Sequence, residues 1–328
     1  MQKILLNKWQ LALVAMAVVI GWISHAWYDR QSINDGSLPE VVRDQSYDLT
    51  KPILFIDNAS TDFQELAPLK EKIGDFIEES KVNGSLTKAG VYFRELDTGK
   101  WTGVDEDDLY IPSSMLKVAI LMVYLNLAQS DPQLISKPLF YNESNLGHPY
   151  YPPAQILKPG NYSVQELLSR MIIDSDNAAT LALKDPVDKD LYDLLVKIGL
   201  PIPPKDLKDF MSPASFSFLF RSLYSSTYLP PYLSEQALKL LTQTSFKVGL
   251  VAGVPRGVLV SHKFGEHTEN YPSTTKPSER ELHDCGIIYY PKNPYLLCVM
   301  TKGGDFSKLE KVISGLSALT YKYVDTSL

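Results

Sequence analysis

The predicted strands of this chain lie at the two ends of its globular part, and the predicted helices lie between them. The pattern over residues 90–104 predicts two strands joined by a turn at Asp97-Thr98-Gly99. Three further strands are predicted near the C-terminus, at residues 257–264, 285–291 and 294–303, the last two as a hairpin around Lys292-Asn293. This order predicts an α+β fold: an antiparallel sheet built from both chain ends, flanked by helices, with an inserted all-helical subdomain.

Helices are predicted where apolar residues recur at helical spacing. Such spacing covers residues 62–82, and residues 307–323 close the chain as an amphipathic helix. Another helix follows Ser163, which is predicted to form a capping box with Glu166. The stretch from 185 to 228 is also expected to be mainly helical.

The N-terminus carries a long apolar run. Residues 11–28, LALVAMAVVIGWISHAWY, are almost wholly apolar, and with the residues back to Ile4 they suffice to cross about 30 Å of hydrocarbon as a helix. Lys3 and Lys8 precede the run. The positive-inside rule therefore places the rest of the chain outside the cytoplasm.

We therefore expect a single-pass protein of the cell membrane. Residues 1–28 would form a short cytoplasmic stub and a transmembrane anchor, residues 29–62 a linker, and residues 63–328 an extracytoplasmic domain. The alternative is a cleaved signal peptide, with Ser24 and Ala26 near the cut site. The anchor is favoured because the apolar run is long for a signal peptide.

Charge and cysteine content exclude several classes of function. The net charge of −6, without a basic cluster, argues against binding to nucleic acid. Cys285 and Cys298 lack a second ligand pair at metal spacing, although His283 is near, so no metal and no cofactor are predicted. We expect two small, buried, apolar cysteine side chains, with a disulfide as the alternative in an oxidising compartment.

Three short motifs carry the candidate chemistry. In IPSSMLKVAIL, Ser114 and Lys117 are three residues apart and share one helix face, so a hydroxyl and an amine meet there. This spacing is weak alone, since Ser85–Lys88 and Ser273–Lys276 repeat it. The other two motifs are Ser175-Asp176-Asn177 and Lys263-Phe264-Gly265, and each is unremarkable alone.

In this order, the motifs resemble those of the class A β-lactamases and penicillin-binding proteins. The signature of that family is S-x-x-K, then S-D-N, then K-T-G. Flanking segments are also similar, including KPGNYSVQELLSRMIIDSDNAAT and HDCGIIYYPKNPYLLCVMTKG. The resemblance covers about residues 63 to 328 and implies a β-lactamase/transpeptidase-like fold.

The resemblance also implies catalytic roles. Ser114 would attack a carbonyl and form an acyl-enzyme. Lys117 would be its base if burial and the neighbouring cation Lys263 lower the pKa of its ammonium. Ser175 would relay a proton to the leaving nitrogen.

Substrate-binding roles are implied for residues around these three. Asn177 would orient Lys117 and donate to the substrate amide, and Lys263 would add positive potential. Gly265 completes the third motif, and the backbone N–H of the next residue, Glu266, would form an oxyanion hole with that of Ser114. Tyr150 or Tyr151 would form a wall of the cleft.

Two departures from the family pattern bear on activity. Phe264 stands where the family has Thr or Ser, whose hydroxyl helps to hold a substrate carboxylate. The stretch from Lys197 to Ser215 contains no Glu, whereas class A enzymes carry one there to activate the deacylating water. Its two carboxylates, Asp206 and Asp209, are expected to be solvated loop charges.

These features predict a serine acyl-enzyme hydrolase that acts on β-lactam amides and deacylates slowly. One alternative is a D-Ala-D-Ala peptidase-like penicillin-binding protein that acts on a peptidoglycan stem peptide. Another is a non-catalytic protein of the same fold that binds muropeptides or β-lactams. We expect a monomer whose partners are a small molecule and, through the N-terminal helix, the membrane.

Overall fold

The computed structural model describes residues 41–43, 46–56, 64–142, 149–206, 208–269, 278–291 and 293–327. Contacts divide the chain into one unit of Val41–Phe55 with Phe63–Leu328 and another of Met1–Glu40 with Ile56–Asp62. Almost all described residues belong to the first unit. The predicted anchor over 1–28 and the linker up to residue 40 lie outside the described residues. Within the described ranges, no helix is long and apolar enough to cross a membrane.

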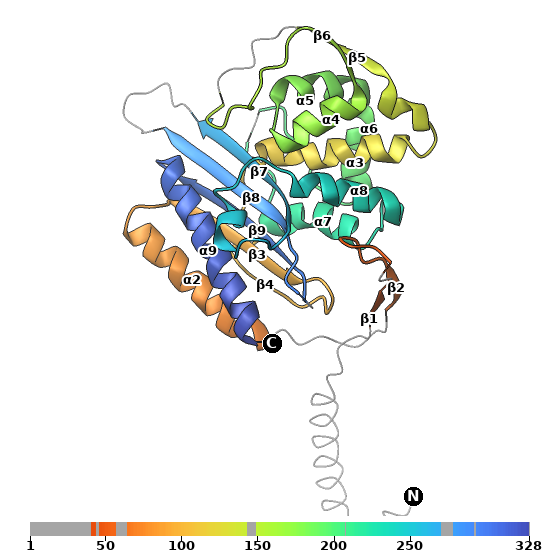
Figure 1. Cartoon of the computed structure of the whole chain (residues 1–328). Helices are drawn as coiled ribbons and strands as arrows, with labels where there is room; N and C mark the ends of the chain where they lie inside the picture. Colours follow the sequence, from red (N-terminus) through yellow and green to blue (C-terminus); the bar gives the residue numbers. More distant parts are fainter. Residues whose placement is uncertain are drawn as a thin grey trace, which may run out of the picture. The chain divides into compact units, whose positions relative to one another are not determined.

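A five-stranded antiparallel sheet forms the centre of the fold, in the order β4-β3-β9-β8-β7 (Figure 1). Its strands are β3 (Lys88–Glu95), β4 (Trp101–Val104), β7 (Val260–Glu269), β8 (Glu279–Ile288) and β9 (Tyr295–Gly303). Pairing of β3 with β9 joins the two halves of the chain, with Val91 opposite Val299. The predicted sheet from both chain ends is therefore confirmed.

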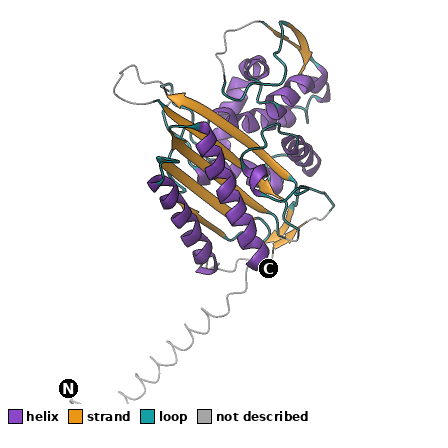
Figure 2. Ribbon diagram, turned by 60° about the vertical axis from the view of Figure 1, so that its left-hand side comes forward, coloured by secondary structure: helices purple, strands orange, loops and turns teal. Residues whose placement is uncertain are grey.

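Helices cover both faces of this sheet (Figure 2). Two of them, α2 (Ala67–Val82) and α9 (Phe306–Ser327), pack on one face. The predicted helix from residue 62 thus starts later, after a 3-10 turn at Gln64–Leu66. Helix α7 (Pro213–Tyr224) and the helical subdomain lie on the other face. The helices of the subdomain are α3 (Lys117–Leu127), α4 (Val164–Ile173), α5 (Asn177–Lys184), α6 (Asp188–Lys197) and α8 (Pro231–Thr242).

The helical subdomain differs from the expected pattern in three details. Strands β5 (Pro138–Tyr141) and β6 (Gly160–Ser163) form a two-stranded sheet that the sequence pattern did not predict. Helix α8 was also not predicted. The Ser163 hydroxyl caps α4 by accepting from the Glu166 N–H at 3.2 Å, whereas the Glu166 carboxylate pairs with Arg170 and leaves the capping box half formed.

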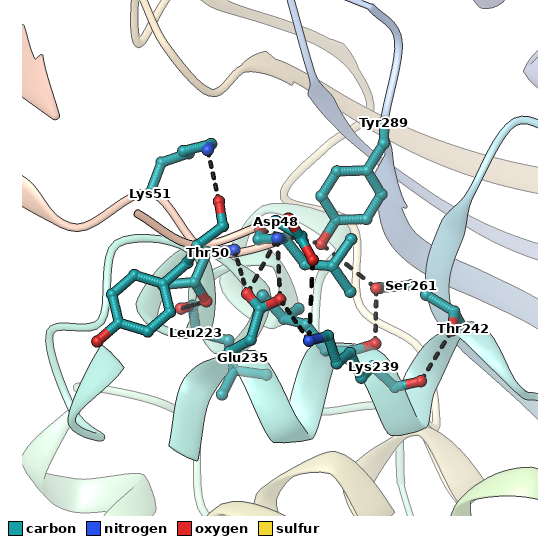
Figure 3. A network of polar contacts seen from close by, with 12 residues as sticks. Asp48, Thr50, Lys51, Leu223, Glu235, Lys239, Thr242, Ser261 and Tyr289 are labelled. Atoms are coloured by element: carbon teal, nitrogen blue, oxygen red, sulfur yellow. Dashed lines mark hydrogen bonds and ion pairs between the residues drawn. The ribbon is translucent and has the colours of Figure 1, made fainter. Parts of the chain in front are cut away.

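Residues 46–52, here called the strap, belong to the range that we expected to be a linker, but they pack on the globular domain. They lie between strands β1 (Val41–Arg43) and β2 (Ile53–Ile56). The Glu235 carboxylate of α8 accepts from the buried N–H groups of Leu49 and Thr50, at 2.9 and 2.8 Å (Figure 3). The Tyr289 hydroxyl donates to the Leu49 carbonyl at 3.2 Å. Side-chain and backbone hydrogen bonds therefore hold the strap in place.

The two cysteines form a disulfide, which corrects our preference for two reduced side chains. Cys285 in β8 lies directly opposite Cys298 in β9, and both are fully buried. Our prediction treated each cysteine by its burial alone. The strand register that brings the two sulfurs together follows from the hairpin, which makes a cross-strand bond possible.

Candidate active site

Ser114 lies in a 3-10 turn, Ser113–Leu116, that leads directly into α3 at Lys117. A 3-10 turn has three residues per turn, so side chains three apart lie one above the other. Ser114 is half-buried and Lys117 is buried. Ser113 has a positive φ of 49°, an uncommon conformation for a residue with a side chain. The turn therefore presents Ser114 and Lys117 on one side.

Gly265 in β7 permits a close approach between this turn and the edge strand of the sheet. A Cβ atom at Gly265 would lie 2.5 Å from the Pro112 carbonyl oxygen and 3.0 Å from Met115 Cγ. Only glycine leaves room for that approach. The third motif therefore places the turn that carries Ser114 against the end of β7 that follows Lys263.

The Lys117 ammonium is held by three acceptors of the second motif. Its Nζ lies 2.6 Å from the Ser175 carbonyl oxygen, 3.1 Å from Ser175 Oγ and 2.8 Å from Asn177 Oδ1. A lysine ammonium has three donors. These contacts therefore use all three N–H donors of the charged amine. Loss of one proton would leave a lone pair on Nζ that can accept a proton.

The second motif forms a strained turn before α5. Ser175 has a φ of 56°, and Asp176 caps α5 by accepting from the N–H groups of Ala178 and Ala179 at 2.8 and 3.3 Å. The cap fixes where Asn177, the first residue of α5, begins the helix. The backbone of this turn thereby directs both Ser175 and Asn177 toward Lys117.

Lys263 completes the cluster from the sheet side. Its side chain is fully buried, and its Nζ donates to Ser175 Oγ at 2.9 Å and to the Phe264 carbonyl at 3.2 Å. The Ser175 hydroxyl oxygen thus lies within hydrogen-bond distance of two lysine side chains. The structure brings together Lys117, Ser175, Asn177 and Lys263, four of the residues that the sequence nominated.

Burial lowers the pKa of both lysines. Desolvation lowers the pKa of Lys117 to about 7, although Asp176 and Glu266 favour its charged form. Desolvation, followed by the positive charge of Lys117, lowers the pKa of Lys263 well below its usual value. A lysine with a pKa near neutrality can act as a general base.

Glu266 contacts the segment that contains Tyr150 through its side-chain carboxylate. The Glu266 carboxylate accepts from the N–H groups of Tyr150 and Tyr151, each at 3.0 Å. The side chain of Tyr150 is 53% exposed, and its ring lies 4.5 Å from that of Phe306. Glu266 therefore fixes residues 150 and 151 beside β7, which sequence reasoning did not predict.

Phe264 faces an aromatic cluster. It is 3% exposed, stacks on Phe246 with ring centroids 4.2 Å apart, and meets Tyr151 edge-on at 5.5 Å. Desolvation raises the pKa of the Tyr151 hydroxyl, which donates to Glu310 at 2.6 Å. The residue after Lys263 thus contributes to the core and offers no hydroxyl.

A buried polar network holds the backbone that leads into the Ser114 turn. Glu281 Oε2 accepts from the Ile111 N–H at 3.1 Å, and His283 Nε2 lies 3.1 Å from the Ile111 carbonyl oxygen. The Thr301 N–H donates to His283 Nδ1 at 3.1 Å. Because Nδ1 accepts and Nε2 faces acceptors, we assign a proton to Nε2.

The same network reaches the stretch from Lys197 to Ser215, in which class A enzymes carry the glutamate that activates the deacylating water. Lys302 Nζ lies 2.7 Å from Asp209 Oδ2 and 3.0 Å from Glu281 Oε1. Asp209 is therefore part of a structural ion pair and not simply a solvated loop charge. Asp206 is exposed and pairs with Lys208.

Sequence reasoning missed the roles of Glu281 and His283. The spacing of Glu281 and His283 could have indicated these roles, because residues two apart in a strand share a face. Polar residues that continue the face of Cys285 and Ile287 indicate a buried polar contact. Within the described ranges, no group of three or more His, Cys, Asp or Glu is arranged to hold a metal ion.

Comparison with known proteins places this fold and motif order in one family. The model of the β-lactamase enzyme family matches residues 68–324. No curated protein sequence matches the chain.

Solved structures with this fold include both penicillin-binding proteins and β-lactamases. PBP-A is 20% identical, with 80% of this chain and 97% of that chain covered and a TM-score of 0.66. The TLA-3 extended-spectrum β-lactamase is 19% identical, with coverages of 78% and 99% and a TM-score of 0.68. A β-lactamase from Chitinophaga pinensis is 15% identical, with coverages of 78% and 99% and a TM-score of 0.66. These structures share the fold that the motifs predicted. The family model covers residues 68–324, most of the chain, and this match shows that the chain belongs to the β-lactamase enzyme family.

Proposed function

We propose that this protein is a serine acyl-enzyme hydrolase in which Ser114 is the nucleophile and Lys117 its base. The observation that carries the proposal is the buried Lys117 amine, which Ser175 and Asn177 hold in place and whose pKa burial lowers to about 7. A neutral amine accepts the proton of a serine hydroxyl, which makes that hydroxyl nucleophilic. The 3-10 turn supports this pairing because it sets both side chains on one side.

Acylation then follows as a balanced proton transfer. Ser114 Oγ forms a bond to the carbonyl carbon while its proton passes to Lys117. Backbone N–H groups of Ser114 and Glu266 would stabilise the oxyanion. When the C–N bond breaks, Ser175 passes a proton to the leaving nitrogen and regains one from Lys117, with which it shares a 3.1 Å contact.

Deacylation is proposed to be slow. Water needs a general base at the ester, and such a base accelerates the reaction by about 10²–10⁴-fold. The stretch from Lys197 to Ser215 has no Glu, and its Asp209 is bound by Lys302. Lys117 would have to act again, as the base of a slower route.

The proposed substrates are β-lactam amides. One solved relative is a mutant of PBP-A described as an acyl-enzyme complex with penicillin G, and it is 22% identical to this chain. A D-Ala-D-Ala peptidase that acts on peptidoglycan stem peptides is the second candidate, because a persistent acyl-enzyme suits transfer or slow hydrolysis. A binding protein that never acylates is the third.

Penicillin labelling tests this proposal. Intact mass after incubation with excess benzylpenicillin should show one adduct, and the adduct should be lost in Ser114→Ala. Absence of any adduct with β-lactams and with depsipeptides would favour the non-catalytic binding protein.

We also propose that residues 1–28 anchor the protein in the cell membrane, with the domain outside the cytoplasm. The lysines before the apolar run support this orientation. Protease added to spheroplasts should cleave the chain beyond Asp29. Full protection would contradict the topology.

A further inference from the structure

We propose that this site prefers neutral acyl donors to donors that carry a free carboxylate beside the scissile amide. The preferred substrate class is thus an uncharged ester or amide of a β-lactam or peptide acid. The inference rests on the proposed acylation of Ser114 and specifies which substrates that reaction accepts.

The side chain after Lys263 gives a carboxylate no donor. Phe264 has no hydroxyl, and its ring is buried against Phe246 and Tyr151. An anion in the site would therefore have to find its hydrogen bonds elsewhere.

The two lysines of the site are already engaged. Lys263 is fully buried and donates to Ser175 and to a backbone carbonyl, and its Nζ lies 4.2 Å from the centroid of the Phe264 ring. Lys117 has three acceptors in the second motif. Burial also favours the neutral form of both amines, which reduces the positive potential at the site.

Glu266 places a carboxylate on the strand that lines the site, although desolvation raises the pKa of this carboxyl. Its carboxylate interacts electrostatically with both Lys117 and Lys263. Within the described ranges, no salt bridge involves Glu266, and its hydrogen bonds come from two backbone N–H groups. An internal carboxylate thus occupies the N–H pair of Tyr150 and Tyr151 that would otherwise be available to an anion.

Asp176 increases the negative charge near Lys117. It is buried, and one of its carboxylate oxygens has no hydrogen-bond partner among the described residues. Two carboxylates therefore lie near a pair of lysines whose pKa values burial lowers. A substrate carboxylate placed here would meet repulsion, and the side chains of Lys117, Lys263 and Phe264 offer it no free donor.

The test compares benzylpenicillin with its methyl ester, which differ in this one charge. The second-order rate of acylation of Ser114 is measured by intact mass, and each rate is divided by the rate of hydroxide hydrolysis of the same compound. We expect the wild-type protein to favour the ester at least about tenfold.

Two variants then test whether the Glu266 charge causes this preference. Glu266→Gln removes the charge and should bring the ratio toward one. Glu310→Gln is the matched control, because Glu310 holds Tyr151 through its hydroxyl, and it should leave the ratio unchanged. Circular dichroism and a melting curve establish that both variants fold.

The outcomes separate the inference from the function on which it rests. Equal normalised rates in the wild-type protein overturn the inference, while Ser114 acylation still stands. A ratio that persists in a folded Glu266→Gln protein also overturns it. If neither compound forms an adduct that is lost in Ser114→Ala, the proposed function fails and the inference fails with it.

Discussion

Lys117 contacts Ser175 through two atoms of that residue: its Nζ lies 2.6 Å from the carbonyl oxygen and 3.1 Å from Oγ. The carbonyl fixes the amine in place, and the hydroxyl gives the proton a path away from it. The positive φ of Ser175 makes the double contact possible, because it turns the carbonyl and the side chain toward the same lysine.

Acylation should depend on the protonation of Lys117. Burial lowers the pKa of Lys117 to about 7, and only the neutral amine accepts the serine proton. The rate should therefore rise about tenfold per pH unit below pH 7 and level off above it. Stopped-flow acylation with the neutral ester measures this profile. In Lys117→Arg, which stays charged, the acylation rate should fall about 10²–10⁴-fold and should no longer depend on pH in this range. An unchanged pH profile in this variant would exclude Lys117 as the base.

Gly265→Ala should impair acylation by moving the Ser114 turn. The added Cβ would lie 2.5 Å from the Pro112 carbonyl, so the turn has to shift away from β7. A displacement of about 1 Å at the nucleophile costs about 10²-fold in rate. Gly304→Ala is the control, because a Cβ there meets nothing within 4 Å. Equal acylation rates in the two variants would show that the close approach does not position Ser114.

Glu281 should stabilise the fold above pH 4.5 and lose that effect in acid. Burial raises the pKa of this carboxyl, but His283 and Lys302 outweigh burial and lower the pKa to about 2. A carboxyl whose pKa is lower in the folded state than in the unfolded state stabilises the fold at pH values above its unfolded-state pKa. This stabilisation is lost as the pH falls through the folded-state pKa. Glu281→Gln should thus cost about 3 kcal/mol at pH 7 and about 1 kcal/mol at pH 3. Urea unfolding at both pH values measures the difference, and an equal cost at both would refute the assignment.

The strap should contribute stability without affecting acylation. Glu235→Gln weakens the acceptor for the Leu49 and Thr50 N–H groups, and we expect a loss of about 1–3 kcal/mol in the free energy of unfolding. Lys239→Gln is the control, because Lys239 pairs with Glu235 at 3.3 Å but is exposed, and its loss should cost about 1 kcal/mol or less. Urea unfolding gives both values. A change in acylation rate in folded Glu235→Gln would link the strap to the site.

The sequence was sufficient for the sheet, the order of layers and the motif cluster. Strand alternation and helical spacing are local signals, and the residues of S-x-x-K, S-D-N and K-x-G sit at element boundaries where the chain can bring them together. Lys117, Ser175, Asn177 and Lys263 meet for that reason. The role of each in catalysis stays a prediction.

No local sequence pattern predicts contacts between segments that are far apart in the chain. The Glu266 carboxylate reaches two backbone N–H groups of a loop in the helical subdomain, and no periodicity encodes such a partner. Strand β8 was predicted too short because Glu281, His283 and Asp284 are polar yet fully or nearly fully buried. Their burial depends on partners from other elements, which only the folded chain supplies.

The most direct measurement is the lifetime of the Ser114 adduct. The protein is incubated with excess benzylpenicillin or its methyl ester, free compound is removed, and intact mass and peptide mapping are followed over time. We predict one adduct on Ser114 that forms faster than it decays, with a burst of product followed by slow turnover. An adduct that survives in Ser114→Ala would contradict it, and so would fast linear hydrolysis without a burst that Asp206→Asn or Asp209→Asn abolishes.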